Sequence, residues 1–238
     1  MNDSKEENDS SIVKNQKNDY VSSLVKSVLG VAPLVGPLLI EVAGVVIPNQ
    51  RLDRIAKFAV CLEHKLSKLD QEFIRQKLTD ENFSDLMEES LLQAARSLTE
   101  ERREYIASLI ANGLLAEDIA FVESKHLLRV LGEINDIEVI WLASYAVKSL
   151  FDTEFKEKHQ DVLKRAPAFL RAPWKDLAKA ALQENYKYHL SHLGLLEPVY
   201  DKDTKTGLAV TDENGFKLQH YQPSLFGKLL LRHIGLVN

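Results

Sequence analysis

The residues of this chain that could support chemistry are few and lie far apart. His189 and His192 are three positions apart, so a helix would place both imidazoles on one face, where they could bind a metal ion. A metal site needs further ligands, and the only cysteine, Cys61, is distant in the sequence. We therefore favour a structural or surface role for both histidines. Cys61, beside Leu62, is expected to be a small buried hydrophobic residue.

Catalytic motifs do not occur in the sequence, which has no Gly-rich phosphate loop, no Gly-x-Ser-x-Gly elbow and no convincing carboxylate pair. We expect no enzymatic activity, no cofactor, no metal and no small-molecule substrate. A single cysteine forms no intramolecular disulfide, which indicates a reducing compartment. A secretory signal begins with basic residues that are followed closely by an apolar core. The segment Met1–Tyr20 is acidic and long, so it does not resemble such a signal. The expected location is cytoplasmic, with association with the inner membrane left open.

The most distinctive feature is the nearly uncharged stretch Ser27–Ile47, whose 21 residues would span the hydrocarbon core of a bilayer as a helix. Its only charge is Glu41, and its glycines and alanines suit close helix packing. Pro33 and Pro37 would interrupt a straight helix. The residues expected to contact a membrane or a partner are Leu29, Val31, Leu34, Val35, Leu38, Leu39, Ile40, Glu41, Val45 and Val46.

Three interpretations of Ser27–Ile47 stay open. It could be a helix that is buried or covered by a partner, a segment that inserts or oligomerises on activation, or a permanent anchor. An intramembrane glutamate costs several kcal/mol unless it is paired or neutralised, so Glu41 argues against a permanent crossing. Basic residues on both flanks leave the orientation undecided.

The elements that must position these residues are mainly helical. Apolar residues spaced three and four apart from Leu52 to Phe73 predict one long amphipathic helix, Gln50–Leu78. Its stripe could be the core face of a bundle or a coiled-coil seam for self-association. Further helices are expected near Asn82–Leu98, Thr99–Gly113, Glu117–Leu131, Asp136–Phe151, Glu154–Leu163 and Pro173–His192.

After Gly194 the pattern changes to short apolar runs and turn residues. Leu208–Thr211 and Phe216–Tyr221 are predicted to pair as a hairpin, and Ser224–His233 is predicted to be a final helix. A helix, a hairpin and a helix in this order are typical of the end of a winged-helix domain. The preceding helix, Pro173–His192, would then be the recognition helix.

Four residues of that helix are candidates for contact with nucleic acid or a protein partner: Lys175, Lys179, Lys187 and His189. Thr153–Leu193 contains eight Lys and Arg against five Asp and Glu, a net charge of only +3. The whole chain carries −5, so it has no general attraction to phosphate backbones. A protein partner or self-association is favoured over nucleic acid, and a membrane partner stays open.

The sequence thus predicts a mainly α fold, a multi-helix bundle with a C-terminal winged-helix-like unit that contains a short β-hairpin. The expected organisation is a disordered tail over 1–20, an apolar helical segment over 21–48, a helical bundle over 49–152 and a winged-helix-like domain over 153–238.

Three stretches resemble the bacterial abortive-infection alpha family of phage-defence proteins: Glu100–Gly113, with its Leu-x-Ala-Asn run, His126–Ile140, and His189–Leu196 together with Pro223–Gly235. The resemblance covers roughly Asn49–Ile234, and the apolar segment before Pro48 is more hydrophobic than the family pattern. It implies a bacterial protein that limits phage growth, including by harming its own cell, and it implies no catalytic residues.

Besides a purely structural oligomerisation subunit, two hypotheses follow from these features. The first is a non-enzymatic phage-defence protein whose conditionally exposed apolar segment acts on a membrane or a partner. The alternative is a winged-helix nucleic-acid-binding or regulatory adaptor protein.

Overall fold

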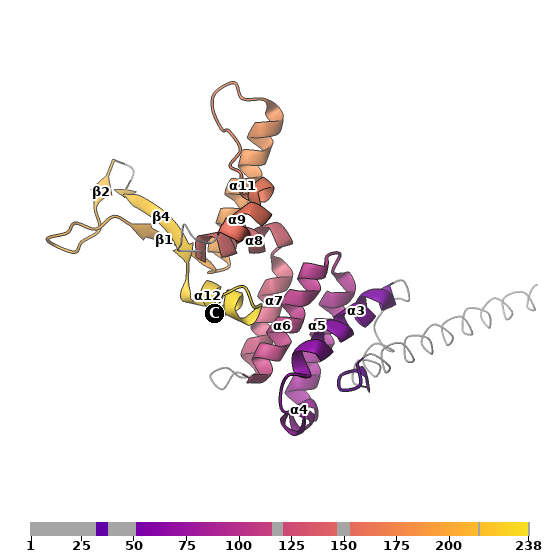
Figure 1. Ribbon diagram of the computed structural model, residues 1–238. Helices are drawn as coiled ribbons and strands as arrows, with labels where there is room; N and C mark the ends of the chain where they lie inside the picture. The colour runs from indigo at the N-terminus through magenta and orange to yellow at the C-terminus, as the bar shows by residue number, and fades with distance from the viewer. Residues whose placement is uncertain (1–31, 38–50, 116–120, 147–152, 214, 238) are drawn as a thin grey trace, which may run out of the picture. The chain divides into compact units, whose positions relative to one another are not determined.

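The computed structural model describes residues 32–37, 51–115, 121–146, 153–213 and 215–237, and the chain divides into two compact units, Met1–Arg129 and Val130–Asn238 (Figure 1). Helices dominate both units, and a short antiparallel sheet lies near the C-terminus, which confirms the predicted fold class. The predicted tail 1–20 and most of the segment 21–48 lie outside the described residues.

The N-terminal unit is a helical bundle. Its helices are α3 (Leu52–Leu66), α4 (Gln71–Leu78), α5 (Glu81–Arg96), α6 (Glu100–Leu115) and the first part of α7 (Phe121–Glu133), within which the division between the units falls. Helices α3, α5 and α6 pack on one another, and α4 packs on α5. The predicted apolar stripe on α3 faces the core of this bundle, because Ile55, Ala59, Leu62 and Leu66 are all fully buried.

The predicted single helix Gln50–Leu78 is two helices, α3 and α4, with a break after Leu66. Polar side chains take the backbone groups at this break. The Ser67 hydroxyl donates to the carbonyl of His64, and Asp70 caps α4 by accepting from the backbone N–H of Phe73 at 2.8 Å. Such hydrogen bonds from side chains to the nearby backbone compete with a continuous helix. The prediction rested on the spacing of apolar residues, which carries no information about these polar contacts.

Two other helix ends differ from the prediction. Helix α5 begins before the expected Asn82, because the Asp80 carboxylate caps it by accepting from the backbone N–H groups of Asn82 and Phe83. Helix α6 runs through Gly113 instead of stopping there. A Cβ built on Gly113 would lie 2.7 Å from the Ser124 hydroxyl, so this glycine permits the close approach of α6 to α7.

The C-terminal unit is organised around α8 (Asp136–Ala146), and the rest of the predicted helix Asp136–Phe151 lies outside the described residues. Helix α8 packs against α10 (Gln160–Leu163), α11 (Trp174–His192), α12 (Leu225–His233) and the strand β4 (Leu218–Pro223). The sequence assigned Asp136–Ala146 to the bundle 49–152. These contacts place it in the second unit, whose boundary therefore falls near Val130 rather than at 153.

The strands of this unit pair across a longer connection than predicted. Strand β4 pairs antiparallel with β1 (Leu196–Tyr200), from Leu196 opposite Pro223 to Tyr200 opposite Leu218. The two predicted strands, Leu208–Thr211 and Phe216–Tyr221, pair with each other near the turn, where β2 (Thr211–Asp212) pairs with β3 (Gly215–Phe216). The predicted pairing of Phe216–Tyr221 with Leu208–Thr211 is thus right at Phe216 and at Lys217, whose backbone N–H donates to the carbonyl of Val210 at 2.8 Å. It is wrong from Leu218 on, because that stretch pairs with β1.

Helix boundaries near the hairpin follow local capping signals. The predicted helix Glu154–Leu163 is interrupted at His159, giving α9 (Thr153–Lys158) and α10. Gly194 ends the following helix, α11, at a φ of +72°, a backbone conformation in which glycine is unstrained. Ser224 caps α12 by accepting from the backbone N–H of Gly227 at 2.9 Å.

Candidate functional site

The first candidate site is the place where the apolar segment meets α3. Of the residues predicted to contact a membrane or a partner, Leu34 and Val35 are in the described part, and Val35 is fully buried together with Ala32. The other predicted contacts lie outside the described residues: Leu29, Val31, Leu38, Leu39, Ile40, Glu41, Val45 and Val46.

A buried carboxylate on α3 holds this short piece of chain. Glu63 is only 8% exposed, and its two oxygens accept from the backbone N–H of Leu34 at 3.2 and 3.1 Å and from that of Val35 at 3.2 Å. The N–H of Gly36 bonds to the carbonyl of Ala32 at 2.7 Å, so residues 32–36 form one turn. We call the contact of Glu63 with this turn the Glu63 anchor.

The chemistry of the turn explains why it needs an acceptor. The first N–H groups of a helical turn have no partner within it, and Pro33 has no N–H at all. The next two N–H groups, those of Leu34 and Val35, are therefore left for an outside acceptor. A carboxylate is favourable at this position because hydrogen bonds to an ionised group are stronger and the start of a helical turn is electropositive.

Glu63 is not among the residues that the sequence predicts to have a role. Its only signal is its position, four residues after Ala59 and three before Leu66, which puts a charged residue at the edge of the apolar stripe. Its partners lie 28 and 29 positions earlier in the chain, so no local pattern connects them.

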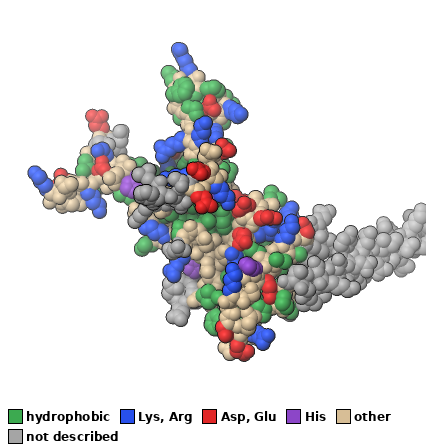
Figure 2. Space-filling model, in the orientation of Figure 1, with side chains coloured by type: hydrophobic (Ala, Val, Ile, Leu, Met, Phe, Trp, Pro, Cys, Tyr) green, Lys and Arg blue, Asp and Glu red, His purple; other side chains and the backbone are tan. Residues whose placement is uncertain are grey.

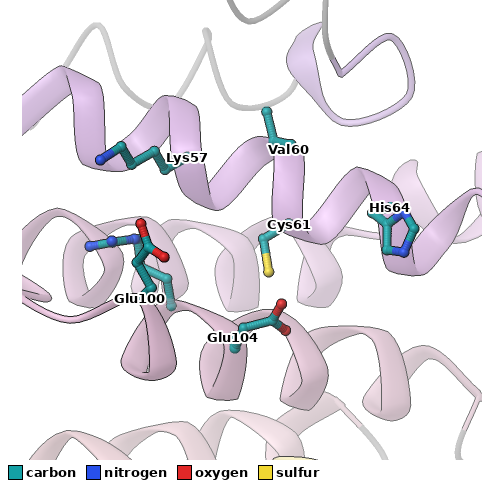
Figure 3. Close-up of a pocket in the computed structure, with 7 residues that line it drawn as sticks. Lys57, Val60, Cys61, His64, Glu100 and Glu104 are labelled. Atoms are coloured by element: carbon teal, nitrogen blue, oxygen red, sulfur yellow. The ribbon is translucent and has the colours of Figure 1, made fainter.

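A pocket of about 480 Å³ lies between α3 and α6 in the same unit (Figure 3). Figure 3 shows Cys61 of α3 and Glu104 of α6 facing each other across it. Glu104 also pairs with Lys65 at 2.8 Å. The lining residues are Lys57, Val60, Cys61, His64, Glu100, Arg103 and Glu104.

The Cys61 thiol in this pocket is held in its protonated form. Burial is the largest cause, and together with the charge of Glu104, to which the thiol donates a hydrogen bond, it raises the pKa of Cys61 to about 12. Burial works against the ionisation of Glu104, but hydrogen bonds from Lys65 and Cys61 outweigh it and lower the pKa of this carboxyl group. Because the thiolate is the reactive form, Cys61 is poorly suited to act as a nucleophile.

The second predicted site, on α11, is only partly available for contacts. Lys175 and Lys179 are exposed, and Lys179 Nζ lies 3.5 Å from the carbonyl oxygen of Asp161. Lys187 forms an ion pair with Glu184, and its Nζ lies 5.0 Å from the ring centre of Tyr221 on β4. Lys187 therefore helps to join α11 to the sheet.

His189, the fourth predicted contact, instead joins α11 to α8. Its Nδ1 lies 2.7 Å from Oε1 of Glu138, a residue that is only 3% exposed. The other carboxylate oxygen, Oε2, accepts from the backbone N–H of Asn135 at 2.8 Å, while the Asn135 side chain accepts from the N–H of Glu138 at 3.0 Å. This reciprocal pair is a capping box at the start of α8, and it leaves one oxygen to receive the imidazole. His189 therefore has a structural role, as favoured from the sequence when metal binding was considered.

Removing this imidazole is expected to destabilise the C-terminal unit. His189→Ala leaves one oxygen of a buried carboxylate unpaired and should lower the free energy of unfolding by about 2 kcal/mol. His192→Ala is the matched control, because His192 is exposed on the same helix, and its effect should stay within about 0.5 kcal/mol. Urea titration followed by tryptophan fluorescence measures both, since Trp141 and Trp174, the two tryptophans of the chain, belong to this unit. Equal midpoints for the two variants would contradict the assignment.

Two further observations concern the predicted metal and membrane properties. Among the described residues, no three His, Cys, Asp or Glu side chains are grouped so that they could hold a metal ion. Within the same parts of the chain, no helix is both long and apolar enough to cross a membrane.

Comparison with known proteins gives no relative of this chain: no protein-family model, no curated protein and no solved structure matches it.

Proposed function

We propose that this chain is a non-enzymatic defence protein of the abortive-infection type. In the resting state, the Glu63 anchor holds residues 32–36, which belong to the apolar sequence Ser27–Ile47, against the helical bundle. A trigger loosens this anchor, and the released segment then acts on a membrane or on a protein partner. The defence role rests on the sequence resemblance, whereas the holding mechanism rests on the anchor.

The observation that carries the proposal is the pair of backbone N–H groups held by one buried carboxylate. The side chains of Ala32 and Val35 are fully buried. The turn of residues 32–36 is therefore held both by apolar side chains and by its backbone N–H groups. The stretch Ser27–Ile47, which includes this turn, is almost uncharged, and its 21 residues are enough to span a bilayer core as a helix. Among the described residues, the anchor's hydrogen bonds to Leu34 and Val35 converge on one carboxylate, so a change at Glu63 alone would weaken the attachment of this turn.

Loss of the anchor is expected to increase membrane activity. Glu63→Ala leaves the N–H groups of Leu34 and Val35 without their acceptor, which should cost about 2 kcal/mol and raise the population of the released state about thirtyfold. The measurement is dye leakage from anionic lipid vesicles by the purified full-length chain. Glu63→Ala should cause leakage at a lower protein concentration than the unaltered chain does.

Two control variants make the result specific. Asp53→Ala removes an exposed carboxylate from the same helix and should leave leakage unchanged. Glu63→Ala combined with Val45→Asp keeps the anchor open but places a charge in the apolar sequence, so the gain should disappear. If Glu63→Ala leaks no more than Asp53→Ala does, the membrane form of the proposal is wrong. If the gain survives Val45→Asp, the segment is not the active element.

A further inference from the structure

The loop of residues 164–173, which joins α10 to α11, carries large apolar side chains in solvent. Phe169 is 60% exposed, Leu170 is 92% exposed, and Trp174, the first residue of α11, is 82% exposed. Single exposed apolar residues are common on protein surfaces, but three on one short stretch of chain mark a contact surface. We call residues 164–175 the apolar-basic loop.

The charges of the apolar-basic loop are all of one sign. Lys164, Arg165, Arg171 and Lys175 are exposed, and residues 162–175 contain no Asp or Glu, which gives four positive charges and no negative one. In Figure 2, green and blue side chains predominate where this loop projects with the start of α11. Because the chain as a whole carries −5, this local excess is not explained by composition.

The base of the loop is fixed by a single side chain of α11. The Gln183 amide donates from Nε2 to the carbonyl of Lys164 at 2.9 Å, and its Oε1 accepts from the backbone N–H of Ala166 at 2.9 Å. This two-point contact satisfies backbone groups that the irregular loop leaves free. The loop is therefore held to α11 near its start.

The tip of the loop is a closed turn under backbone strain. The N–H of Ala172 donates to the carbonyl of Phe169 at 3.0 Å, and Ala172 itself is buried. Arg171 lies at φ +74°, a left-handed conformation that a residue with a side chain adopts only at an energetic cost. Strain kept at a turn that exposes Phe169 and Leu170 points to a function for these side chains.

We propose that the apolar-basic loop binds an anionic lipid surface. Phe169, Leu170 and Trp174 enter the boundary between headgroups and acyl chains, and the four cations face the lipid phosphates and carboxylates. Aromatic residues favour this boundary, and basic residues around an apolar tip are attracted to anionic lipids. The most exposed side chain, Leu170, is aliphatic, so it gains by entering hydrocarbon but offers no ring for a base to stack on. This distinguishes a lipid surface from single-stranded nucleic acid.

The test is co-sedimentation of the full-length chain with vesicles of phosphatidylcholine, with and without phosphatidylserine. Leu170→Asp should weaken binding to the anionic vesicles at least about tenfold, because an apolar contact is lost and a charge of the wrong sign is gained. Arg171→Glu should weaken it by a similar factor through charge alone. Leu225→Asp is the matched control, since Leu225 is 84% exposed on α12, and its binding should equal that of the unaltered chain.

Fluorescence gives a second readout from the same samples. Trp141 is buried, so a blue shift of the emission on adding anionic vesicles reports that Trp174 has left water. The shift should be absent with phosphatidylcholine alone and smaller at high salt. An unchanged urea midpoint for Leu170→Asp shows that its fold is intact.

The outcome separates this surface from the apolar segment Ser27–Ile47. Binding by the loop should persist in Val45→Asp, which disables the segment, and should be lost in Leu170→Asp, whose Glu63 anchor is untouched. Equal vesicle binding by Leu170→Asp and Leu225→Asp overturns the proposal. A second result also overturns it: the unaltered chain does not bind vesicles but binds single-stranded DNA, and Trp174→Ala abolishes the DNA binding.

Discussion

Gly227→Ala is expected to lower the free energy of unfolding of the C-terminal unit by at least about 3 kcal/mol, because a side chain at this position meets backbone. A Cβ built on Gly227 would lie 2.1 Å from the carbonyl oxygen of Leu195 and 3.0 Å from its carbonyl carbon. Both residues are buried, and the same carbonyl accepts from the backbone N–H of Ser224 at 3.0 Å. The methyl group can be accommodated only if α12 moves away from the backbone of Leu195, which breaks this contact.

The measurement is again urea denaturation followed by tryptophan emission. Lys228→Ala is the control, because it changes the adjacent residue to alanine on the exposed side of the same helix and should stay within about 0.5 kcal/mol. If Gly227→Ala unfolds at the same urea concentration as Lys228→Ala, the close approach of α12 to Leu195 is wrong.

Cys61 is expected to react with iodoacetamide at pH 8 about a thousandfold more slowly in the folded chain than in the unfolded chain. With the pKa of its thiol raised from 9.0 to about 12, about one thiol in ten thousand is ionised at this pH, against about one in ten when unfolded. The pocket of about 480 Å³ beside the thiol admits a reagent of this size, so ionisation rather than access limits the rate. Mass spectrometry of the single alkylated site gives the rate in each state.

Glu104→Gln tests the cause of this protection. It removes the negative charge next to the thiol, so the pKa of Cys61 should fall and alkylation should accelerate, although burial, the larger cause, remains. Glu100→Gln changes another carboxylate that lines the pocket and should leave the rate unchanged. Alkylation of the folded chain at the rate of the unfolded chain would refute the assignment.

The same pKa shift also predicts how the stability of the N-terminal unit depends on pH. The unfolded thiol ionises from about pH 9, whereas the folded thiol keeps its proton up to about pH 12. The unfolded state therefore releases a proton first, and the contribution of this group to stability is present below pH 9 and declines as the pH rises towards 12.

The conditional release of Ser27–Ile47 is a proposal that the Glu63 variants can decide. It does not depend on the apolar-basic loop, which lies in the other unit and would bring the chain to an anionic membrane by itself. Vesicle leakage and vesicle binding therefore measure two properties of the chain through different residues.

The sequence by itself determined the helical content and several of the helix ends. Helices α6, α11 and α12 begin or end close to the residues expected from the sequence: Thr99 accepts from the backbone N–H of Arg102 at the start of α6, Gly194 follows α11, and Ser224 caps α12. Such contacts join residues a few positions apart, so their chemistry is visible in a short window of sequence. The burial of the α3 stripe follows in the same way from apolar spacing.

The tertiary structure alone decided which polar side chains carry the candidate sites. Glu63 bonds to Leu34 and Val35, and Glu138 bonds to His189 across 51 positions, although sequence patterns gave these residues no role or a different one. The pairing of β1 with β4 was likewise decided by the tertiary structure, since the sequence predicted pairing only within Leu208–Tyr221. Periodicity indicates which face of an element is buried, but the partner of a buried polar group depends on how distant elements pack together.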